Sequence, residues 1–315
     1  MGQTIRVRDI LILLMGLTVL SSQPLLAAED KAEPGYSKAG ADTCLRCHDE
    51  SSEFPVVGIF RTKHAIASDE RSPFGQLQCE SCHGPGKAHT GRVRRGKERP
   101  DMLNFGSEAN TPVPEQNAMC EGCHQSQIGA NWHGGMHESA DLSCADCHSV
   151  HTEKDPVFDT AMQPQVCFEC HRSQKTDSLR FSSHPIRFGK MACTDCHNPH
   201  GTVAESDLRR DTLNDTCYEC HTEKRGPFLW EHAPVSEDCS LCHEVHGSNH
   251  PSLLTRRAPL LCQQCHSQAG HPSIAHTSSG LPSQGQSSYL GVNSCANCHS
   301  QVHGSNHPSG GRLTR

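Results

Sequence analysis

Ten copies of the pattern Cys-x-x-Cys-His occur along the chain of 315 residues, and together they use all 20 of its cysteines. This pattern is typical of covalently attached c-type haem. Two thiols add to the vinyl groups of one haem, and the histidine that follows binds the iron through an imidazole nitrogen. The predicted haem-bonding residues are Cys44, Cys47, Cys79, Cys82, Cys120, Cys123, Cys144, Cys147, Cys167, Cys170, Cys193, Cys196, Cys217, Cys220, Cys239, Cys242, Cys262, Cys265, Cys295 and Cys298. The predicted proximal iron ligands are His48, His83, His124, His148, His171, His197, His221, His243, His266 and His299.

Three other uses of paired cysteines fit the sequence less well. Cys-x-x-Cys pairs build zinc sites, but a zinc site does not need a histidine directly after every second cysteine. A disulfide scaffold suits an exported protein, yet it too leaves these histidines without a role. Thioredoxin-like redox motifs do not occur in tens. Haem c therefore explains the pattern best, and ten motifs predict ten covalent haems.

The remaining histidines are predicted to supply the second axial ligand of each iron. The chain has 24 histidines, so 14 lie outside the motifs. One lies upstream of each even-numbered motif and another lies after it, which gives ten candidate distal ligands. They are His64, His89, His137, His151, His184, His200, His232, His246, His271 and His303. Methionine, the other common axial ligand, is scarce, so bis-histidine iron of low potential is expected.

Four histidines are left over, and two of them compete for a predicted ligand position. Residues 245–252 and 302–309 both read VHGSNHPS, so either His250 or His307 could replace the neighbouring candidate. His133 and His276 are interpreted as solvated surface residues. The pairing between distal and proximal histidines is left open by the spacing.

The composition is poor in material for a conventional core. Hydrophobic residues make up 34% of the chain and aromatic residues 4%. Haem faces would supply the missing apolar surface, so folding is expected to depend on haem attachment. The net charge of −7 argues against nucleic acid as a partner.

The elements that position the motifs are predicted to be short and repeated. Residues 1–28 have the basic start, apolar run and small-residue end of a secretory signal peptide. Residues 29–315 form the decahaem domain, with five two-haem units at roughly 40–90, 115–155, 160–205, 210–250 and 257–310. The regular motif spacing is typical of a repeat array. We expect an extended, haem-stacked multihaem cytochrome c with short helices, much irregular structure and few or no strands; one such helix is expected to start at residues 214–216.

Three segments carry a more specific resemblance. Residues 214–235 (NDTCYECHTEKRGPFLWEHAPV), 257–266 (RAPLLCQQCH) and 298–310 (CHSQVHGSNHPSG), with the motif order, closely resemble the MtrA/DmsE/PioA/MtoA family of periplasmic decahaem cytochromes. The resemblance runs from about residue 35 to the C-terminus. It implies a bis-histidine haem wire that enters an outer-membrane β-barrel porin of the MtrB type, whose polar lumen suits a polar chain. It also implies the proximal and distal ligands named above, with His64 and His89 in the most stretched unit.

The sequence leaves three functions open. The resemblance favours an electron conduit across the outer membrane, located in the periplasm and associated with the porin. Its partners would be periplasmic carriers and an extracellular multihaem cytochrome or terminal reductase, with iron oxide, dimethyl sulfoxide reductase or ferrous iron at the far end. The alternative is a soluble periplasmic shuttle that feeds a reductase. A multihaem enzyme is disfavoured because a catalytic haem needs an open axial position, and no catalytic residue is predicted. The direction of electron flow is not encoded in the spacing.

Overall fold

The computed structural model describes residues 35–53, 55–266 and 295–314. The predicted signal peptide and the histidines at positions 271 and 276 lie outside the described residues. The described residues belong to a single compact unit that begins at Gly35. The five predicted two-haem units all fall inside it.

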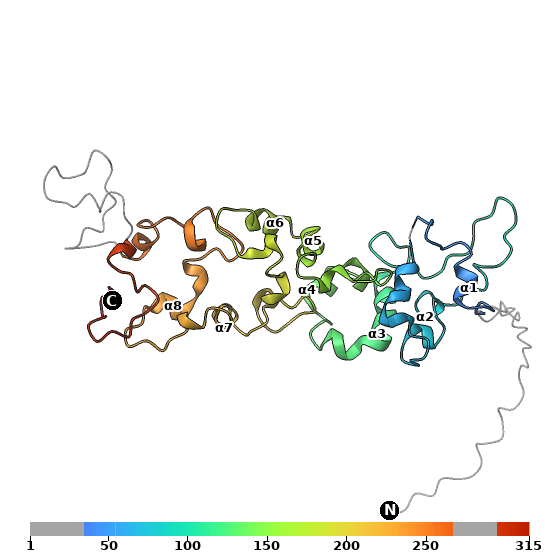
Figure 1. Ribbon diagram of the computed structural model, residues 1–315, viewed down its shortest axis with the longest axis horizontal. Coiled ribbons are helices and arrows are strands. Elements are labelled where there is room, and N and C mark those ends of the chain that lie inside the picture. The colour runs from blue at the N-terminus through green and yellow to red at the C-terminus, as the bar shows by residue number, and fades with distance from the viewer. Residues whose placement is uncertain (1–34, 54, 267–294, 315) are drawn as a thin grey trace, which may run out of the picture. The chain divides into compact units, whose positions relative to one another are not determined.

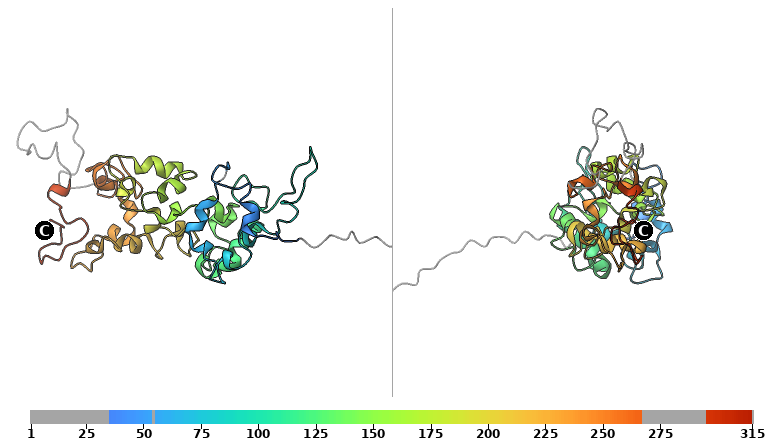
Figure 2. Two further views of the ribbon diagram at one scale, coloured as in Figure 1. Left: turned by 45° about the vertical axis from the view of Figure 1, so that its right-hand side comes forward. Right: turned by 90° about the vertical axis from the view of Figure 1, so that its left-hand side faces the viewer.

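Short helices separated by irregular segments make up this unit (Figures 1 and 2). The α-helices are α1 (Ala41–Cys44), α2 (Glu80–His83), α3 (Val113–Ile128), α4 (Met136–Ser139), α5 (Gln163–Phe168), α6 (Arg172–Ser178), α7 (Leu213–Tyr218) and α8 (Ala233–Glu237). The 3₁₀ turns are η1 (Val57–Arg61), η2 (Lys63–Ala65), η3 (Pro73–Gly75), η4 (Cys144–Asp146), η5 (Pro156–Phe158), η6 (Pro185–Phe188), η7 (Cys193–Asp195), η8 (Glu205–Asp207), η9 (Thr222–Lys224), η10 (Cys239–Leu241), η11 (Pro251–Leu253), η12 (Cys262–Gln264) and η13 (Cys295–Asn297). Extended pairing in the described residues is limited to isolated bridges such as His197 with Leu208 and His243 with Leu254. The predicted fold class is confirmed.

Each motif folds as one helical turn, because its first cysteine and its histidine are four residues apart. The amide of His48 donates to the carbonyl of Cys44 at 3.0 Å, and the same bond joins His221 to Cys217 at 2.9 Å. Residues four apart lie on one face of a helical turn. The turn therefore presents the first thiol and the imidazole on the same side, as attachment to one ring requires.

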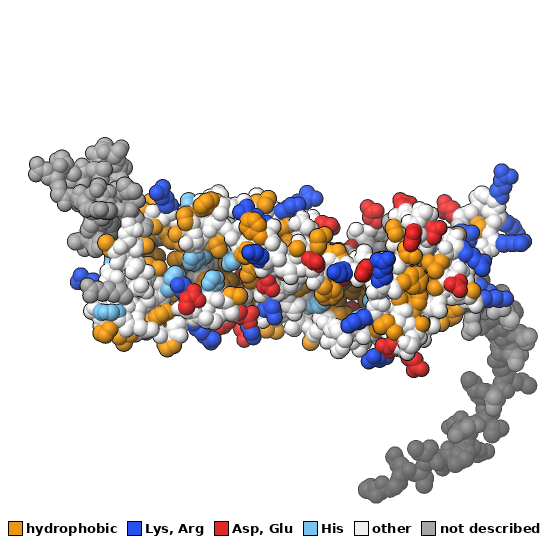
Figure 3. Space-filling view, viewed as in Figure 1, with side chains coloured by type: hydrophobic (Ala, Val, Ile, Leu, Met, Phe, Trp, Pro, Cys, Tyr) orange, Lys and Arg blue, Asp and Glu red, His pale blue; other side chains and the backbone are white. Residues whose placement is uncertain are grey.

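Few hydrophobic side chains are buried in the described part of the chain. They are Ala41, Phe74, Trp132, Phe168 and Ala192. Large hydrophobic side chains are instead exposed, among them Phe158 at 81%. Figure 3 shows a surface with hollows in which histidine side chains are visible. The side chains of the described residues thus form no continuous apolar core, as the composition predicts.

Buried amide side chains join successive motifs where apolar packing is missing. Asn117 of α3 accepts the amide of Cys144 at 2.8 Å, and Asn214 of α7 accepts the amide of Cys239 at 2.8 Å. Both asparagines are buried. The expectation that a helix starts at residues 214–216 is wrong in detail, because Thr212 caps α7 through the amide of Asp215 and leaves Asn214 free for this bridge.

No helix in the described ranges combines the length and the apolar character needed to cross a bilayer.

Candidate haem-binding sites

Pairs of facing imidazole rings are the main feature of the site. Within the described residues, eight pairs each join one motif histidine to one predicted distal histidine. The pairs are His48 with His89, His83 with His151, His124 with His64, His148 with His200, His171 with His137, His197 with His246, His266 with His232, and His243 with His303. The ring centres lie between 5.9 Å for His124 with His64 and 6.4 Å for His48 with His89.

These distances fit a metal ion held between the rings. Two imidazoles on opposite faces of one metal, each with a metal–nitrogen bond of about 2 Å, place their ring centres roughly 6 Å apart. Direct stacking would bring the rings closer than this. The geometry therefore suits haem iron with one imidazole on each face.

The side chains around one pair also fit a large apolar group with polar edges. The ring of Phe158 lies 5.6 Å from that of His148 although the Phe158 side chain is largely exposed. Trp132 lies edge-on to His200 and is buried, yet its Nε1–H has no acceptor in the described residues. A porphyrin would cover the phenyl ring, and its carboxylate edges offer the kind of acceptor that a buried indole requires.

Burial keeps several of these imidazoles neutral, which iron ligation requires. It lowers the pKa of His64 and His151, and the facing histidine of each pair, His124 or His83, lowers it further. Burial also lowers the pKa of His200 and His246, again with help from the facing ring. Neutral rings leave a lone pair on one nitrogen of each.

The Nδ1 atoms of the even-numbered motif histidines are held by groups further along the chain. His83 donates to the carbonyl of Leu103 at 2.7 Å, and His299 donates to that of Arg312 at 2.6 Å. His197 and His243 donate to the carbonyls of Ser206 and Ser252, both at 2.8 Å. His148 differs, because its acceptor is the carboxylate of Asp155. Each bond leaves Nε2 as the atom available to iron.

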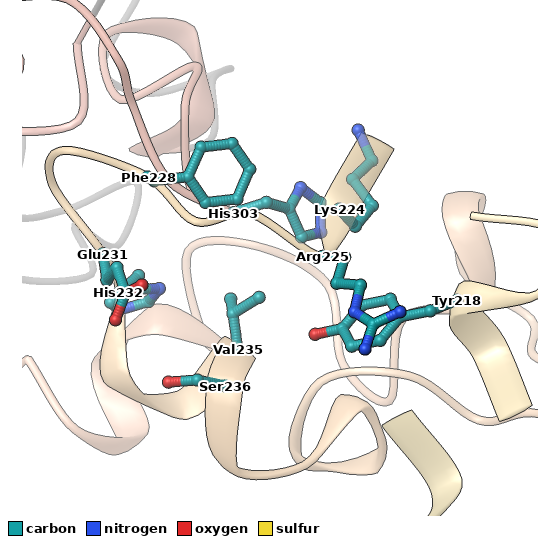
Figure 4. A pocket seen from close by; sticks show the side chains of 9 residues that line it. All are labelled: Tyr218, Lys224, Arg225, Phe228, Glu231, His232, Val235, Ser236 and His303. Carbon is teal, nitrogen blue, oxygen red and sulfur yellow. The ribbon is translucent and has the colours of Figure 1, made fainter. Parts of the chain in front are cut away.

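Distal histidines are held in a second way, which links neighbouring sites. His137, His184 and His232 donate Nδ1 to the carbonyls of Pro199, Val245 and Val302, at 2.8, 3.0 and 2.9 Å. Each carbonyl belongs to the residue directly before another distal histidine. In the last case, His232 and His303 also line one cavity together with Tyr218 and Phe228, as Figure 4 shows.

The positions of the cysteines show which motifs lie next to each other. Contacts between first cysteines join odd motifs to the following even ones: Cys44 with Cys79, Cys120 with Cys144, Cys167 with Cys193, Cys217 with Cys239, and Cys262 with Cys295. The second cysteine of each even motif lies near enough to the second cysteine of the following odd motif for the two thiols to influence each other electrostatically: Cys82 with Cys123, Cys147 with Cys170, Cys196 with Cys220, and Cys242 with Cys265. Every motif thus lies near the motifs that precede and follow it in the sequence.

Four predicted ligands lie outside these ring pairs. His221 of the seventh motif and the predicted distal ligand His184 are both described but occur in none of the eight pairs, and His184 has its own Nδ1 bond. His299 has its Nδ1 bond as well, and His271 lies outside the described residues. His246 and His303, rather than His250 and His307, face motif histidines. His133 is exposed and bonds Glu138, which raises its pKa, and its role as a surface residue stays a prediction.

The sequence did not predict the residues that orient the ligands. Ser206 and Ser252 present their carbonyls from a left-handed conformation, with φ of 56° and 57°. This conformation is strained for serine and has no sequence signature as clear as glycine. The one sequence feature that these serines share is their spacing, because each lies nine residues after the motif histidine that it orients, His197 or His243.

Sequence comparisons agree with this site. The family described as "Doubled CXXCH motif" matches residues 184–226 and 232–271, and "Cytochrome c-type protein NrfB-like" matches residues 79–162. Each doubled match starts at a predicted distal histidine and covers one even motif and the following odd one, a frame displaced by one motif from the units expected above. The fold and site thus define a multihaem c-type cytochrome.

Whole-chain similarity narrows this class. The chain is 48% identical over 286 residues to the multiheme cytochrome MtrA of Shewanella baltica, covering 90% of this chain and 84% of the relative. It is 28% identical over 149 residues to the cytochrome c-type protein NrfB of Haemophilus influenzae, covering 42% of this chain and 65% of that protein. The chain belongs to the MtrA family of multihaem electron-transfer cytochromes.

Proposed function

We propose that the protein carries ten haems, each with histidine on both faces of the iron, and conducts electrons along them. The observation that carries this proposal is the set of facing imidazole pairs at iron-spanning distance, which joins sixteen of the twenty predicted ligands. Of the ten predicted distal ligands, His184 and His271 remain, and we assign them to the motifs of His221 and His299.

The order of cysteine contacts supports a single conducting path. A thioether joins each cysteine to the edge of a haem, so a contact between cysteines of two motifs brings two haem edges together. Five contacts between first cysteines alternate with four electrostatic interactions between second cysteines, and together they lead from the first motif to the tenth. The rate of electron transfer falls steeply with distance. An electron is therefore expected to pass from each haem to the haem of the next motif in the sequence.

The ligand arrangement favours a carrier over an enzyme. Haem supplies reversible one-electron chemistry at its iron, while the chain decides what else reaches that iron. Two histidines per site close both axial positions, and their Nδ1 bonds to Leu103, Val245 and similar groups hold the rings in place. Substrate then has no open position at which to bind.

The resemblance to the MtrA/DmsE/PioA/MtoA family leads us to place this wire in the periplasm, inserted in an outer-membrane β-barrel porin. Periplasmic carriers would exchange electrons at one end. An extracellular multihaem cytochrome, a terminal reductase such as dimethyl sulfoxide reductase, or iron oxide or ferrous iron would do so at the other. A soluble periplasmic shuttle remains the second candidate, supported by the partial likeness to NrfB over residues that include the second to fourth motifs.

Two measurements test the proposal in sequence. The mass of the exported protein should exceed that of its chain by ten haems, and the oxidised protein should be low-spin throughout. Affinity purification of the tagged protein from detergent-solubilised outer membranes should then recover a large β-barrel in fixed ratio. A low-spin protein recovered without a barrel supports the shuttle. Rapid carbon monoxide binding by several haems contradicts the wire itself.

A further inference from the structure

The fourth motif differs from the other even-numbered motifs in the group that holds its proximal histidine. His148 donates Nδ1 to Oδ2 of Asp155 at 2.7 Å. The corresponding rings of the second, sixth, eighth and tenth motifs donate to backbone carbonyls at 2.6 to 2.8 Å. The chain thus contains four neutral examples of the same bond beside one with a carboxylate.

Asp155 is built into this position rather than placed there by a mobile surface side chain. Its side chain is 14% exposed. Its second oxygen, Oδ1, accepts the amide of Val157 at 3.3 Å and so caps the turn η5. Among the described residues no lysine or arginine lies within ion-pair distance of the carboxylate. Its charge is therefore directed at His148 and is not offset by a neighbouring cation.

A carboxylate acceptor makes the ligand more basic than a carbonyl does. A hydrogen bond to an anion polarises the Nδ1–H bond and moves electron density to Nε2, the nitrogen that remains available to iron. The more electron-rich nitrogen stabilises ferric iron relative to ferrous iron. Partial burial strengthens the effect because a half-buried charge is screened less than a solvated one.

We propose that Asp155 tunes the fourth haem to a lower reduction potential than it would have with a backbone acceptor. This inference rests on the bis-histidine sites proposed above. Reduction adds one electron to the iron, and the proton stays on Nδ1 in both states. In this proposal Asp155 acts on the iron through His148, without direct contact with the iron or the porphyrin. It is therefore a positioning residue.

The consequence concerns the energy profile along the path. The fourth motif contacts the third through Cys144 and Cys120, and its Cys147 lies near enough to Cys170 of the fifth for the two thiols to interact electrostatically. An electron that passes from the first motif to the tenth must cross it. A lower potential makes the fourth haem harder to reduce than it would be with a carbonyl acceptor, so it would accept an electron later during reduction of the array.

The substitution Asp155→Asn tests the proposal in the full-length holoprotein. Asparagine keeps the size of the side chain and an oxygen for the cap of Val157, but it removes the charge. In a spectroelectrochemical titration, one component in ten should shift to a more positive potential, and the other nine should coincide with those of the unsubstituted protein. EPR of the oxidised form should show an altered signal for one low-spin haem. Asp155→Glu should restore the original titration.

Asp159→Asn is the matched control, because Asp159 is an exposed carboxylate four residues away that also accepts backbone amides. It should leave every component in place. An unchanged titration in Asp155→Asn overturns the proposal, and so does an equal shift in Asp159→Asn, which would indicate a general charge effect. If Asp155→Asn does not mature, Asp155→Ser provides a second neutral variant with the same expected shift. Mass and spin state are measured on the same samples. A missing haem or a high-spin haem would contradict the proposed sites, whereas ten low-spin haems with unchanged potentials would contradict only the role of Asp155.

Discussion

His246 faces His197 with ring centres 6.2 Å apart and ring planes only 20° apart. The next residue, Gly247, has φ of 151°, and a Cβ there would lie 1.9 Å from the carbonyl oxygen of Asp177. His303 is also followed by a glycine with positive φ in tight contact, at Gly304. Glycine after the histidine lets the chain approach its neighbour closely enough to place the ring. His250 is followed by Pro251, which has no such freedom.

Substitutions of His246 and of His250 should therefore have different effects on the haems. His246→Ala removes the ring that faces His197, so one haem should become five-coordinate, high-spin and open to carbon monoxide. His250→Ala should leave all haems low-spin. Optical and EPR spectra of the oxidised proteins, and carbon monoxide binding to the reduced proteins, measure the difference. A high-spin haem in His250→Ala with none in His246→Ala would reverse the assignment.

The angle between the two rings predicts which sites have unusual EPR signals. The rings of His64 and His124 are 79° apart, and those of His137 and His171 are 86° apart. Perpendicular imidazoles donate into different iron d orbitals and keep them nearly equal in energy, which gives a large maximum g value. The other described pairs are tilted by 11° to 38° and should give ordinary rhombic signals.

Site-directed loss of signal checks this assignment. His64→Ala should remove one of the large-g signals, whereas His303→Ala, whose partner ring is tilted by only 11°, should remove a rhombic one. Ten rhombic signals in the unsubstituted protein would contradict the ring orientations.

Residues whose role follows from their own chemistry could be predicted from the sequence. Residues whose role depends on where the folded chain places them could not. Cys44 and His48 are recognisable because the haem reaction itself dictates their spacing. The pairing of His124 with His64 was not predictable, since the two are 60 residues apart and several other histidines were equally available in the sequence. Backbone acceptors such as the Ser206 carbonyl are harder still, because every residue has a carbonyl. Their selection depends on a local left-handed turn that tertiary contacts impose.

The close contact of Gly247 gives a prediction for stability. Gly247→Ala should destabilise the protein by about 1–3 kcal/mol, because alanine is strained at this φ and its methyl group meets the backbone of Asp177. Chemical denaturation followed by circular dichroism measures the loss. Gly96 also has a positive φ, of 80°, but a Cβ there would meet nothing within 4 Å. Gly96→Ala isolates the strain of the dihedral angle and should cost less; an equal cost at both positions would show that the contact with Asp177 contributes nothing.

Glu80 gives a prediction for pH. It accepts the backbone amide of Ser37 at 2.9 Å, the Ser37 hydroxyl at 2.8 Å and the amide of Gly86 at 2.7 Å, so one buried carboxylate ties the first described residues to α2. Burial alone would raise the pKa of Glu80, but these hydrogen bonds outweigh it and hold the pKa below the ordinary 4.5. The charged form is thus favoured in the folded state. Its contribution to stability is fully present above pH 4.5 and is lost as the pH falls through the lower, folded-state pKa.

The substitution Glu80→Gln separates this effect from other acid-induced changes. At pH 7 it should reduce the protection of residues 35–41 against hydrogen exchange by an amount equivalent to about 1.5–3 kcal/mol, the usual range for hydrogen bonds to a charged group. The difference from the unsubstituted protein should shrink as the pH falls below 4.5, because protonated glutamic acid and glutamine are both neutral. Glu50 is exposed and follows the first motif in the sequence. Glu50→Gln therefore serves as the control and should change the protection of residues 35–41 neither at pH 7 nor at low pH. A difference between Glu80→Gln and the unsubstituted protein that stays constant down to pH 3 would mean that the amide geometry, and not the carboxylate charge, holds this segment in place.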